Sequence, residues 1–145
     1  MSYLIDSDWL IDYLIGRTAA GRMVDRLMPD GIAISIITYM EVIEGFRGGD
    51  DRSGSERGLQ GFRQFLLGAP PVGISLALAD RAADVRIELR RQKRHVHHRA
   101  LDILIAATAI DRNLILVTRN ARDYDDISGL KMLEGAKLSM GDGMS

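Results

Sequence analysis

Residues 100–117 read ALDILIAATAIDRNLILV, and this stretch determines the fold that we expect. Residues 100–111 are rich in alanine, leucine and isoleucine at helical spacing, and Asn113 is a residue type that commonly ends a helix. The next four residues, Leu114 to Val117, are all apolar, which is typical of a strand buried on both faces. A helix followed by such a strand predicts a parallel sheet with helices on both sides.

The same alternation runs along the rest of the chain. We expect strands at residues 3–5, 32–36, 72–74, 114–117 and 131–133, and helices at 8–16, 19–28, from 38 onward, 59–67, 76–93 and 100–111. Asp8 and Thr38 are the expected caps of two helices, with Glu41 as the capping-box partner of Thr38. Residues 47–58, rich in glycine, serine and charge, are expected to form a loop. The pattern predicts a three-layer α/β/α sandwich with a central parallel sheet of four or five strands. Residues 1–134 would form one domain, and 135–145 a flexible tail.

The composition excludes several classes of protein. With 145 residues the chain is long enough to bury a core, and without cysteine it has no disulfides, cysteine-ligated zinc or iron–sulfur cluster. No apolar run approaches the roughly 20 residues that span a bilayer. The first residues, MSYLID, have no basic segment typical of a signal peptide. We therefore expect a cytoplasmic protein with no membrane partner.

The charges are unevenly distributed. The chain has 19 lysines and arginines against 20 acids, and a net charge of −1 taken alone argues against a nucleic-acid partner. Residues 86–99, however, hold six bases and one acid, Glu88, together with all three histidines. This segregation indicates an acidic site beside a basic surface, and the alternative is a solvated helix face followed by a polar loop.

Four carboxylates are expected near the carboxyl edge of the predicted sheet. Asp6 comes directly after the first strand, Glu41 lies at the start of the helix after the second, Asp102 in the first turn of helix 100–111, and Asp123 after strand 114–117. Carboxylates in one pocket repel each other, and a divalent cation relieves that repulsion. Oxygen ligands without cysteine favour Mg²⁺ or Mn²⁺.

Each of these positions also has a simpler interpretation. Asp6 suits a loop or cap, Asp102 suits a helix N-terminus, Glu41 suits a capping box, and Asp123 belongs to an acidic turn. Ser7 and Asp8 are candidates for supporting hydrogen bonds to the site, and a helix cap is the alternative role of Asp8. His95, His97 and His98 include two adjacent residues and lack a fourth ligand at matching spacing, so phosphate contact or a polar loop is favoured over zinc.

Four motifs in this order resemble the PIN-domain ribonucleases, and most closely the VapC toxins of toxin–antitoxin pairs. The motifs are LIDSD with Asp6, SIITYMEVIEG at residues 35–45, DILIAATA from Asp102, and VTRNARDY ending at Tyr124. The resemblance covers residues 3 to about 133. It implies an α/β/α endoribonuclease whose metal is held by Asp6, Glu41, Asp102 and Asp123, with Thr118 and Asn120 beside them.

The resemblance also implies a mechanism and partners. A metal-bound water would hydrolyse RNA and leave a 5′-phosphate and a 3′-hydroxyl. The bases expected to hold the RNA backbone are Arg90, Arg91, Arg94, Arg99, Arg119 and Arg122. A small antitoxin would block the site, and the toxin would be a homodimer or part of a heterotetramer or larger complex. Two apolar stripes, Trp9/Leu10/Tyr13/Leu14 and Met23/Leu27, are candidate docking surfaces, although packing on the sheet would explain them equally.

The sequence departs from the family at two places. Some relatives carry the last acid two residues after the threonine, where this chain has Asn120, so either Asn120 or Asp123 is nearer the metal. The stretch from His95 to Leu101 replaces the small polar loop that relatives have before the third acid.

Two other functions are compatible with parts of the sequence. Asp6-Ser7-Asp8 is similar to the start of haloacid-dehalogenase phosphatases, but Leu10 stands where that family has threonine or valine. A catalytically inactive module that binds RNA or antitoxin is the second alternative, although none of the four acids is missing.

Overall fold

Five parallel strands form the centre of the molecule. The computed structural model describes residues 2–134, so the predicted tail at 135–145 lies outside them. The strands are β1 (Tyr3–Ile5), β2 (Ile32–Ser35), β3 (Pro71–Val72), β4 (Ile115–Thr118) and β5 (Lys131–Glu134), in the order β3-β2-β1-β4-β5. In this register Leu4 lies opposite Ala33 on one side and Leu116 on the other, which makes β1 the central strand.

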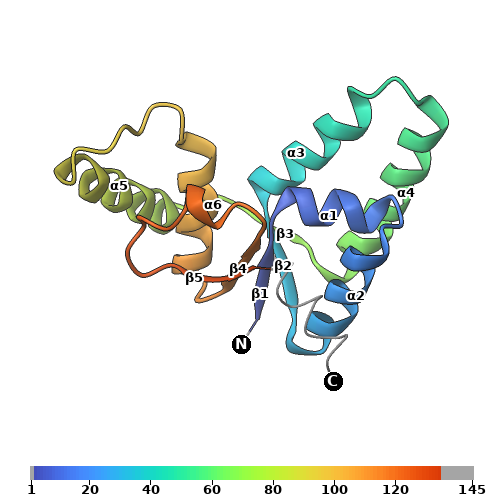
Figure 1. Ribbon diagram of the computed structural model, residues 1–145, viewed down its shortest axis with the longest axis horizontal. Coiled ribbons are helices and arrows are strands. Elements are labelled where there is room, and N and C mark those ends of the chain that lie inside the picture. Colours follow the sequence, from blue (N-terminus) through green and yellow to red (C-terminus); the bar gives the residue numbers. More distant parts are fainter. Residues whose placement is uncertain (1, 135–145) are drawn as a thin grey trace.

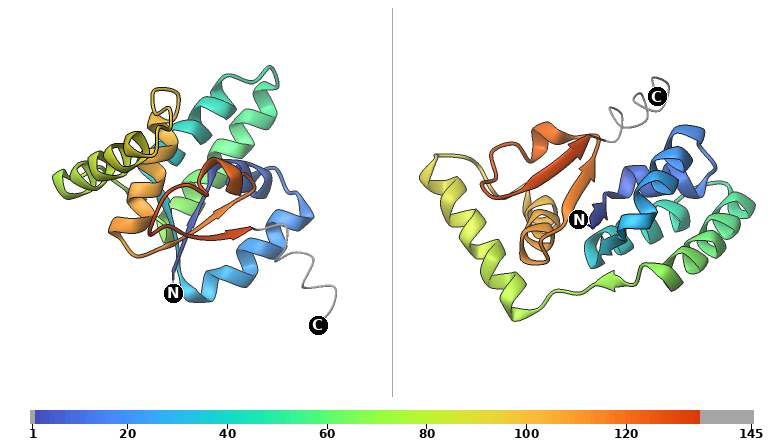
Figure 2. Two further views of the ribbon diagram at one scale, coloured as in Figure 1. Left: turned by 60° about the vertical axis from the view of Figure 1, so that its left-hand side comes forward. Right: turned by 90° about the horizontal axis from the view of Figure 1, so that it is seen from below.

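Helices cover both faces of this sheet, and the predicted three-layer α/β/α sandwich is confirmed. Figures 1 and 2 show α5 (Leu76–Arg91) and α6 (Ala100–Asp111) on one face. The other face carries α1 (Ser7–Leu14), α2 (Thr18–Leu27), α3 (Ile36–Arg47) and α4 (Arg52–Gly68). Two short turns, η1 (Met28–Asp30) and η2 (Ala121–Asp123), follow α2 and β4. Within residues 2–134, no helix has both the length and the apolar character needed to cross a bilayer.

The apolar runs of the strands serve two separate cores. Leu4 and Leu116 are fully buried in the core under α5 and α6. Their neighbours Ile5 and Val117 are fully buried on the opposite face, among residues of α1 to α4. Successive side chains of a strand point to opposite faces, so a strand covered on both sides must be apolar at every position.

Two helices begin earlier than the sequence predicted, because the last polar residue at each strand end takes the cap. Asp6 rather than Asp8 caps α1, and its Oδ1 accepts a 2.8 Å hydrogen bond from the Ser7 amide. Ser35 rather than Thr38 caps α3, and its hydroxyl accepts from the Thr38 amide at 2.9 Å. The chain thus passes directly from strand to helix, which brings α1 and α3 to the carboxyl edge of the sheet.

The predicted loop at 47–58 is wrong over its second half, because α4 already begins at Arg52. The Asp51 side chain caps this helix by accepting from the Gly54 amide at 3.1 Å. Gly58 is buried against the ring of Phe46 on α3, where a Cβ atom would collide with the ring. Glycine therefore serves the close packing of α3 and α4, although its low helix propensity favours a loop in the sequence.

Candidate active site

Asp6 is the most buried carboxylate at the carboxyl edge of the sheet. Asp6 directly follows β1, and it is only 7% exposed. Oδ1 accepts from the Ser7 amide, and Oδ2 accepts from the Thr118 hydroxyl at 2.9 Å. Burial raises the pKa of Asp6 above its usual value, the two hydrogen bonds oppose this, and Asp8 and Asp102 raise it further. The protein therefore holds a carboxylate in place that it makes costly to ionise.

Glu41 approaches Asp6 from α3. Burial is the largest cause of its raised pKa, followed by the negative charge of Asp6, while a hydrogen bond from the Ser7 side chain opposes the shift. Its Oε1 atom is buried and has no hydrogen-bond partner. An unpaired buried oxygen of this kind normally requires an explanation, such as an ion or a water at that position.

Asp102 lies on the first turn of α6, where the sequence placed it. Burial raises its pKa, a hydrogen bond from Tyr124 opposes the shift, and Asp123 raises it further. The Tyr124 hydroxyl donates to Asp102 Oδ1 at 3.3 Å.

Tyr124 is a site residue that the sequence reasoning missed as a functional side chain. It is 2% exposed, and burial together with the charges of Asp6, Asp102 and Glu41 raises its pKa, so the hydroxyl keeps its proton as a donor. One signal was available: Tyr124 directly follows Asp123 in the last family motif. Its approach to Asp102, 22 residues away in the chain, depends on the fold.

The predicted supporting residues form a hydrogen-bonded chain around Asp6. Thr118, fully buried at the end of β4, donates to Asp6 and accepts from the Asn120 amide at 3.0 Å. The Asn120 side chain donates to Asp8 Oδ2 at 3.3 Å. Asp8 is exposed, and its charge contributes to the raised pKa of both Asp6 and Glu41.

Asp123 lies farther out than the other three acids. It is exposed on η2, and its charge reaches Asp102. Asn120, the other candidate for the fourth position, points its side chain at Asp8. Asp123 therefore stays the predicted fourth acid, because its negative charge raises the pKa of Asp102.

A divalent cation fits the chemistry of this acidic site. Among residues 2–134, no three acidic or histidine side chains are already spaced to surround one ion. The donors are nevertheless hard carboxylate oxygens, their mutual repulsion would be relieved by positive charge, and Glu41 Oε1 lacks a partner. Asp6, Glu41 and Asp102 are the residues that would hold the ion.

Arg99 binds within the protein instead of standing free at the surface. Its guanidinium donates to both carboxylate oxygens of Asp126, at 2.7 and 2.9 Å, and to the Asp123 carbonyl at 2.9 Å. These bonds raise the pKa of Arg99 and lower that of Asp126. Arg99 therefore ties the segment that carries Asp123 and Tyr124 to the start of α6, next to Asp102.

We expect Arg99→Ala and Asp126→Ala to have the same effect. Either change should lower the free energy of unfolding by about 1–2 kcal/mol, because it breaks a bidentate, partly buried pair. Both should also weaken catalysis by loosening the segment beside Asp102. Denaturant unfolding and RNA cleavage rates of the two single variants and the double variant form a thermodynamic cycle. An Asp126→Ala protein that cleaves RNA as fast as the wild type, beside a slow Arg99→Ala protein, would instead assign Arg99 to the RNA.

The other predicted RNA-binding arginines divide into two groups. Arg119 forms an ion pair with Asp12 and lies over the Trp9 ring, 4.0 Å from its centroid. Arg90, Arg91, Arg94 and Arg122 are exposed, and Arg94 approaches Asp126 only at 4.0 Å.

Most of the two predicted docking stripes belongs to the core. Trp9 is 3% exposed and Leu10 fully buried, and the Met23/Leu27 stripe packs in the same core. Tyr13 and Leu14 alone reach the surface, where they line a groove between α1, η1 and α4.

An α/β/α fold with a carboxylate cluster at the carboxyl edge of its sheet defines the class of protein. The chain belongs to the PIN-domain family, whose model matches residues 3–130. It is similar to the tRNA(fMet)-specific endonuclease VapC of Shigella flexneri, with 29% identity over 131 residues, 90% of this chain and 96% of that protein.

Solved structures show the same likeness. A toxin–antitoxin complex from Klebsiella pneumoniae matches with 30% identity and a TM-score of 0.69, over 92% of this chain and 98% of that one. DNA-bound VapBC from Salmonella typhimurium matches in fold with a TM-score of 0.78 and 24% identity, over 93% of this chain and 98% of that one. The predicted resemblance is therefore confirmed at the level of the family.

Proposed function

We propose that this protein is a metal-dependent endoribonuclease and the toxin of a type II toxin–antitoxin pair. The observation that carries the proposal is the group of Asp6, Glu41 and Asp102, which three different elements bring to one sheet edge and whose pKa values are all raised. Membership of the PIN-domain family and the similarity to a VapC endonuclease support it.

In this proposal Asp6, Glu41 and Asp102 hold Mg²⁺ or Mn²⁺, with Asp123 at the outer side. Such an ion, when bound, lowers the pKa of a coordinated water and offsets charge on the phosphate. Ser7 and Thr118 fix both oxygens of Asp6, and Tyr124 holds Asp102, so these carboxylates are oriented before substrate arrives. Hydrolysis forms a bond from the water oxygen to phosphorus and breaks the bond to O3′. The water proton is lost, O3′ gains a proton, and the products end in a 5′-phosphate and a 3′-hydroxyl.

The match of the PIN-domain model to residues 3–130 argues against the phosphatase alternative. The hydrogen bonds from the Ser7 amide and the Thr118 hydroxyl fix the orientation of Asp6 and leave a lone pair on each of its oxygens. This arrangement suits a metal ligand, whose carboxylate is commonly held by further hydrogen bonds.

We assign contact with the RNA backbone to the exposed arginines of the basic segment, Arg90, Arg91 and Arg94, and to Arg122. Contacts of this kind are salt-sensitive and independent of sequence. Arg99 and Arg119 contribute mainly through the groups that they hold in place.

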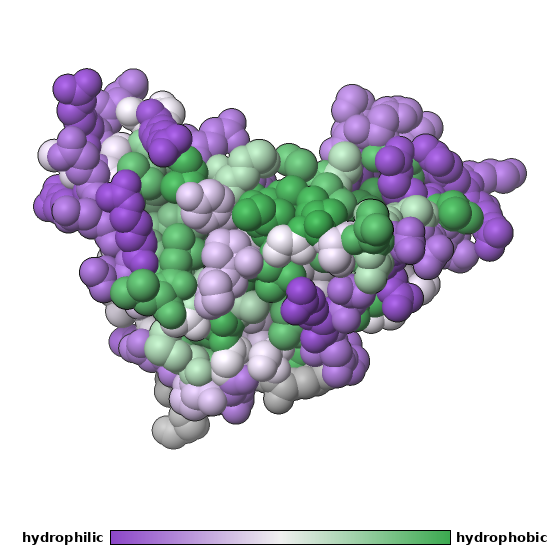
Figure 3. Space-filling view, turned by 180° about the vertical axis from the view of Figure 1, so that it is seen from behind, coloured by the Kyte–Doolittle hydropathy of each residue, from purple (hydrophilic) through white to green (hydrophobic). Residues whose placement is uncertain are grey.

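We further propose a cytoplasmic protein that pairs with a small antitoxin and with a second copy of itself. The groove beside Tyr13 and Leu14, with Phe65 and Met28 on its walls, suits an apolar antitoxin segment. For the homodimer we favour the apolar groove between α5 and α6, where Ile87 is 45% exposed and Ala83 and Leu104 line the walls. Figure 3 shows apolar surface gathered across the middle of the rear face. A toxin dimer with two antitoxins would give the heterotetramer.

We expect expression in bacteria without an antitoxin to arrest growth, and Asp102→Ala to abolish the arrest, because the variant loses an acid of the site. Asp111→Ala, on the same helix but at its far end, is the matched control and should remain toxic. Growth curves and mapping of new RNA 5′ ends after induction provide the measurement. An Asp102→Ala protein that still arrests growth without cutting RNA would favour the inactive binding module.

A further inference from the structure

The loop between α5 and α6 is held firmly at both ends. The Lys93 amide donates to the Arg90 carbonyl and the Arg94 amide to the Leu89 carbonyl, both at 2.9 Å, which closes the end of α5. Val96 is 4% exposed and packs into the core shared by α5 and α6. At the other end Arg99 is fixed by Asp126. The backbone between these anchors is therefore tied to the rest of the domain on both sides of Val96.

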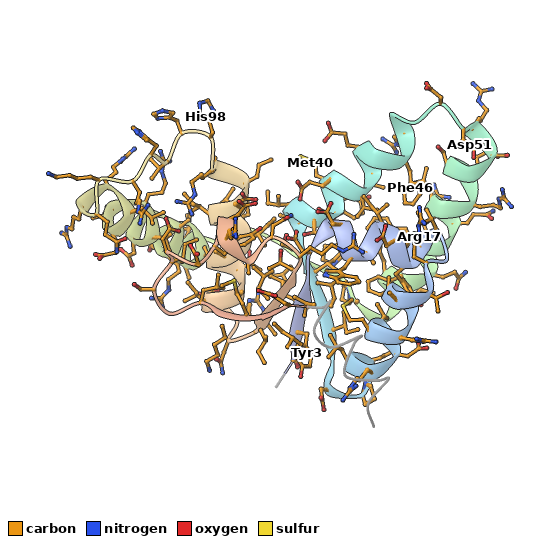
Figure 4. All side chains as sticks on the ribbon, in the orientation of Figure 1. Tyr3, Arg17, Met40, Phe46, Asp51 and His98 are labelled. Carbon is orange, nitrogen blue, oxygen red and sulfur yellow. The ribbon has the colours of Figure 1, made fainter. Side chains whose placement is uncertain are left out.

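Two of the three histidines on this loop face the acidic site. A pocket of about 320 Å³ lies between α3 and the start of α6, lined by Glu41, His97, His98, Ala100, Leu101 and Asp102. His95 does not line it. Figure 4 shows His98 on the loop at one side of this opening and Met40, the neighbour of Glu41, on the other side. The rings of His97 and His98 meet edge to face, with centroids 5.1 Å apart.

The chemistry of this pocket suits one unpaired nucleotide. Its volume lies at the lower end of small-ligand pockets, roughly 300–1,000 Å³. Exposed aromatic rings stack on the bases of single-stranded RNA, whose faces are hidden in a duplex. Leu101, 42% exposed, adds an apolar surface to the same wall.

We propose that His97 and His98 form a stacking subsite for an unpaired RNA base next to the cleaved phosphate. This rests on the proposed ribonuclease function and makes it more specific: the substrate is single-stranded at the cut. The subsite binds the base beside the scissile phosphate, and Glu41 and Asp102, which would hold the ion, line the same pocket.

The test measures binding separately from cleavage. Fluorescence anisotropy with a short, unpaired, fluorescein-labelled RNA is recorded on the full chain in EDTA at low salt, with a duplex of the same sequence as comparison. His97→Ala/His98→Ala should weaken binding of the unpaired RNA by about tenfold. His97→Phe/His98→Phe, which keeps the rings, should stay within about threefold of the wild type. His95→Ala is the matched control and should bind as the wild type does.

Each result has a definite meaning. Two results with the variants overturn the inference: a double alanine variant with wild-type affinity, or a double phenylalanine variant that binds as weakly as the alanine one. Two results with the wild type also overturn it: equal affinity for the duplex and the unpaired RNA, or no binding of the unpaired RNA. A wild type that binds the unpaired RNA through both histidines but cleaves no RNA with Mg²⁺ or Mn²⁺ would overturn the proposed nuclease and leave the binding subsite standing.

Discussion

Asp6→Asn is expected to lower the rate of RNA cleavage by at least about a hundredfold while the protein stays folded. Asparagine has nearly the same shape and is an equally good helix cap, so the hydrogen bond from the Ser7 amide can be retained. What the change removes is the negative charge that would hold a divalent cation between β1 and α3, together with the oxygen that accepts from the Thr118 hydroxyl. Cleavage of a labelled RNA with Mg²⁺, followed by gel analysis, measures the effect.

The control for this variant is Asp25→Asn. Asp25 is an exposed acid on α2 and is not one of the proposed site residues. It should cleave at the wild-type rate, and circular dichroism should show native helix content for both variants. An Asp6→Asn protein that cleaves like the wild type at saturating Mg²⁺ would refute the role assigned to the acidic site.

The positions of Asp6 and Asp102 could be predicted because each has a local signal. An acid directly after an apolar strand, or on the first turn of an apolar helix, lies at the carboxyl edge wherever strands are parallel. Within residues 2–134, the same reasoning placed the five strands and all helices but α4 within a few residues. The local sequence pattern is enough to place a strand that is covered on both faces, because nearly all of its residues are then apolar.

Features that depend on contacts between distant segments could not be predicted in this way. The pairing of Arg99 with Asp126 joins residues 27 apart, and in the sequence Arg99 is one more base of a basic segment. Tyr124 reads as an ordinary aromatic residue until the fold places its hydroxyl on Asp102. The start of α4 was missed for the opposite reason: packing of Gly58 on Phe46 overrides the local preference of a glycine-rich segment.

The metal-free protein is expected to lose stability as the pH rises above about 5. Asp6, Glu41 and Asp102 have pKa values raised above the ordinary 3.8 or 4.5, so the folded state binds their protons more tightly than the unfolded state does. Stability therefore falls as pH rises from these ordinary values through the raised ones. Asp126 acts in the other direction, but its lowered pKa makes its contribution complete above about pH 5.

Mg²⁺ should reverse this loss at neutral pH, because an ion bound only by the folded state stabilises it by about 2.7 kcal/mol at a hundredfold excess over its dissociation constant. For a chain of this length that corresponds to a rise in Tm of about 5–10 °C. Thermal melts in EDTA and in Mg²⁺, with NaCl at matched ionic strength, measure both effects. Asp6→Asn should melt above the wild type in EDTA and respond less to Mg²⁺, whereas Asp25→Asn should follow the wild type. Two results would contradict this prediction: a melting temperature in EDTA that rises with pH, or a melting temperature that Mg²⁺ does not change. Either would show that the three carboxylates are stable together without a cation. The unpaired oxygen of Glu41 would then need another explanation.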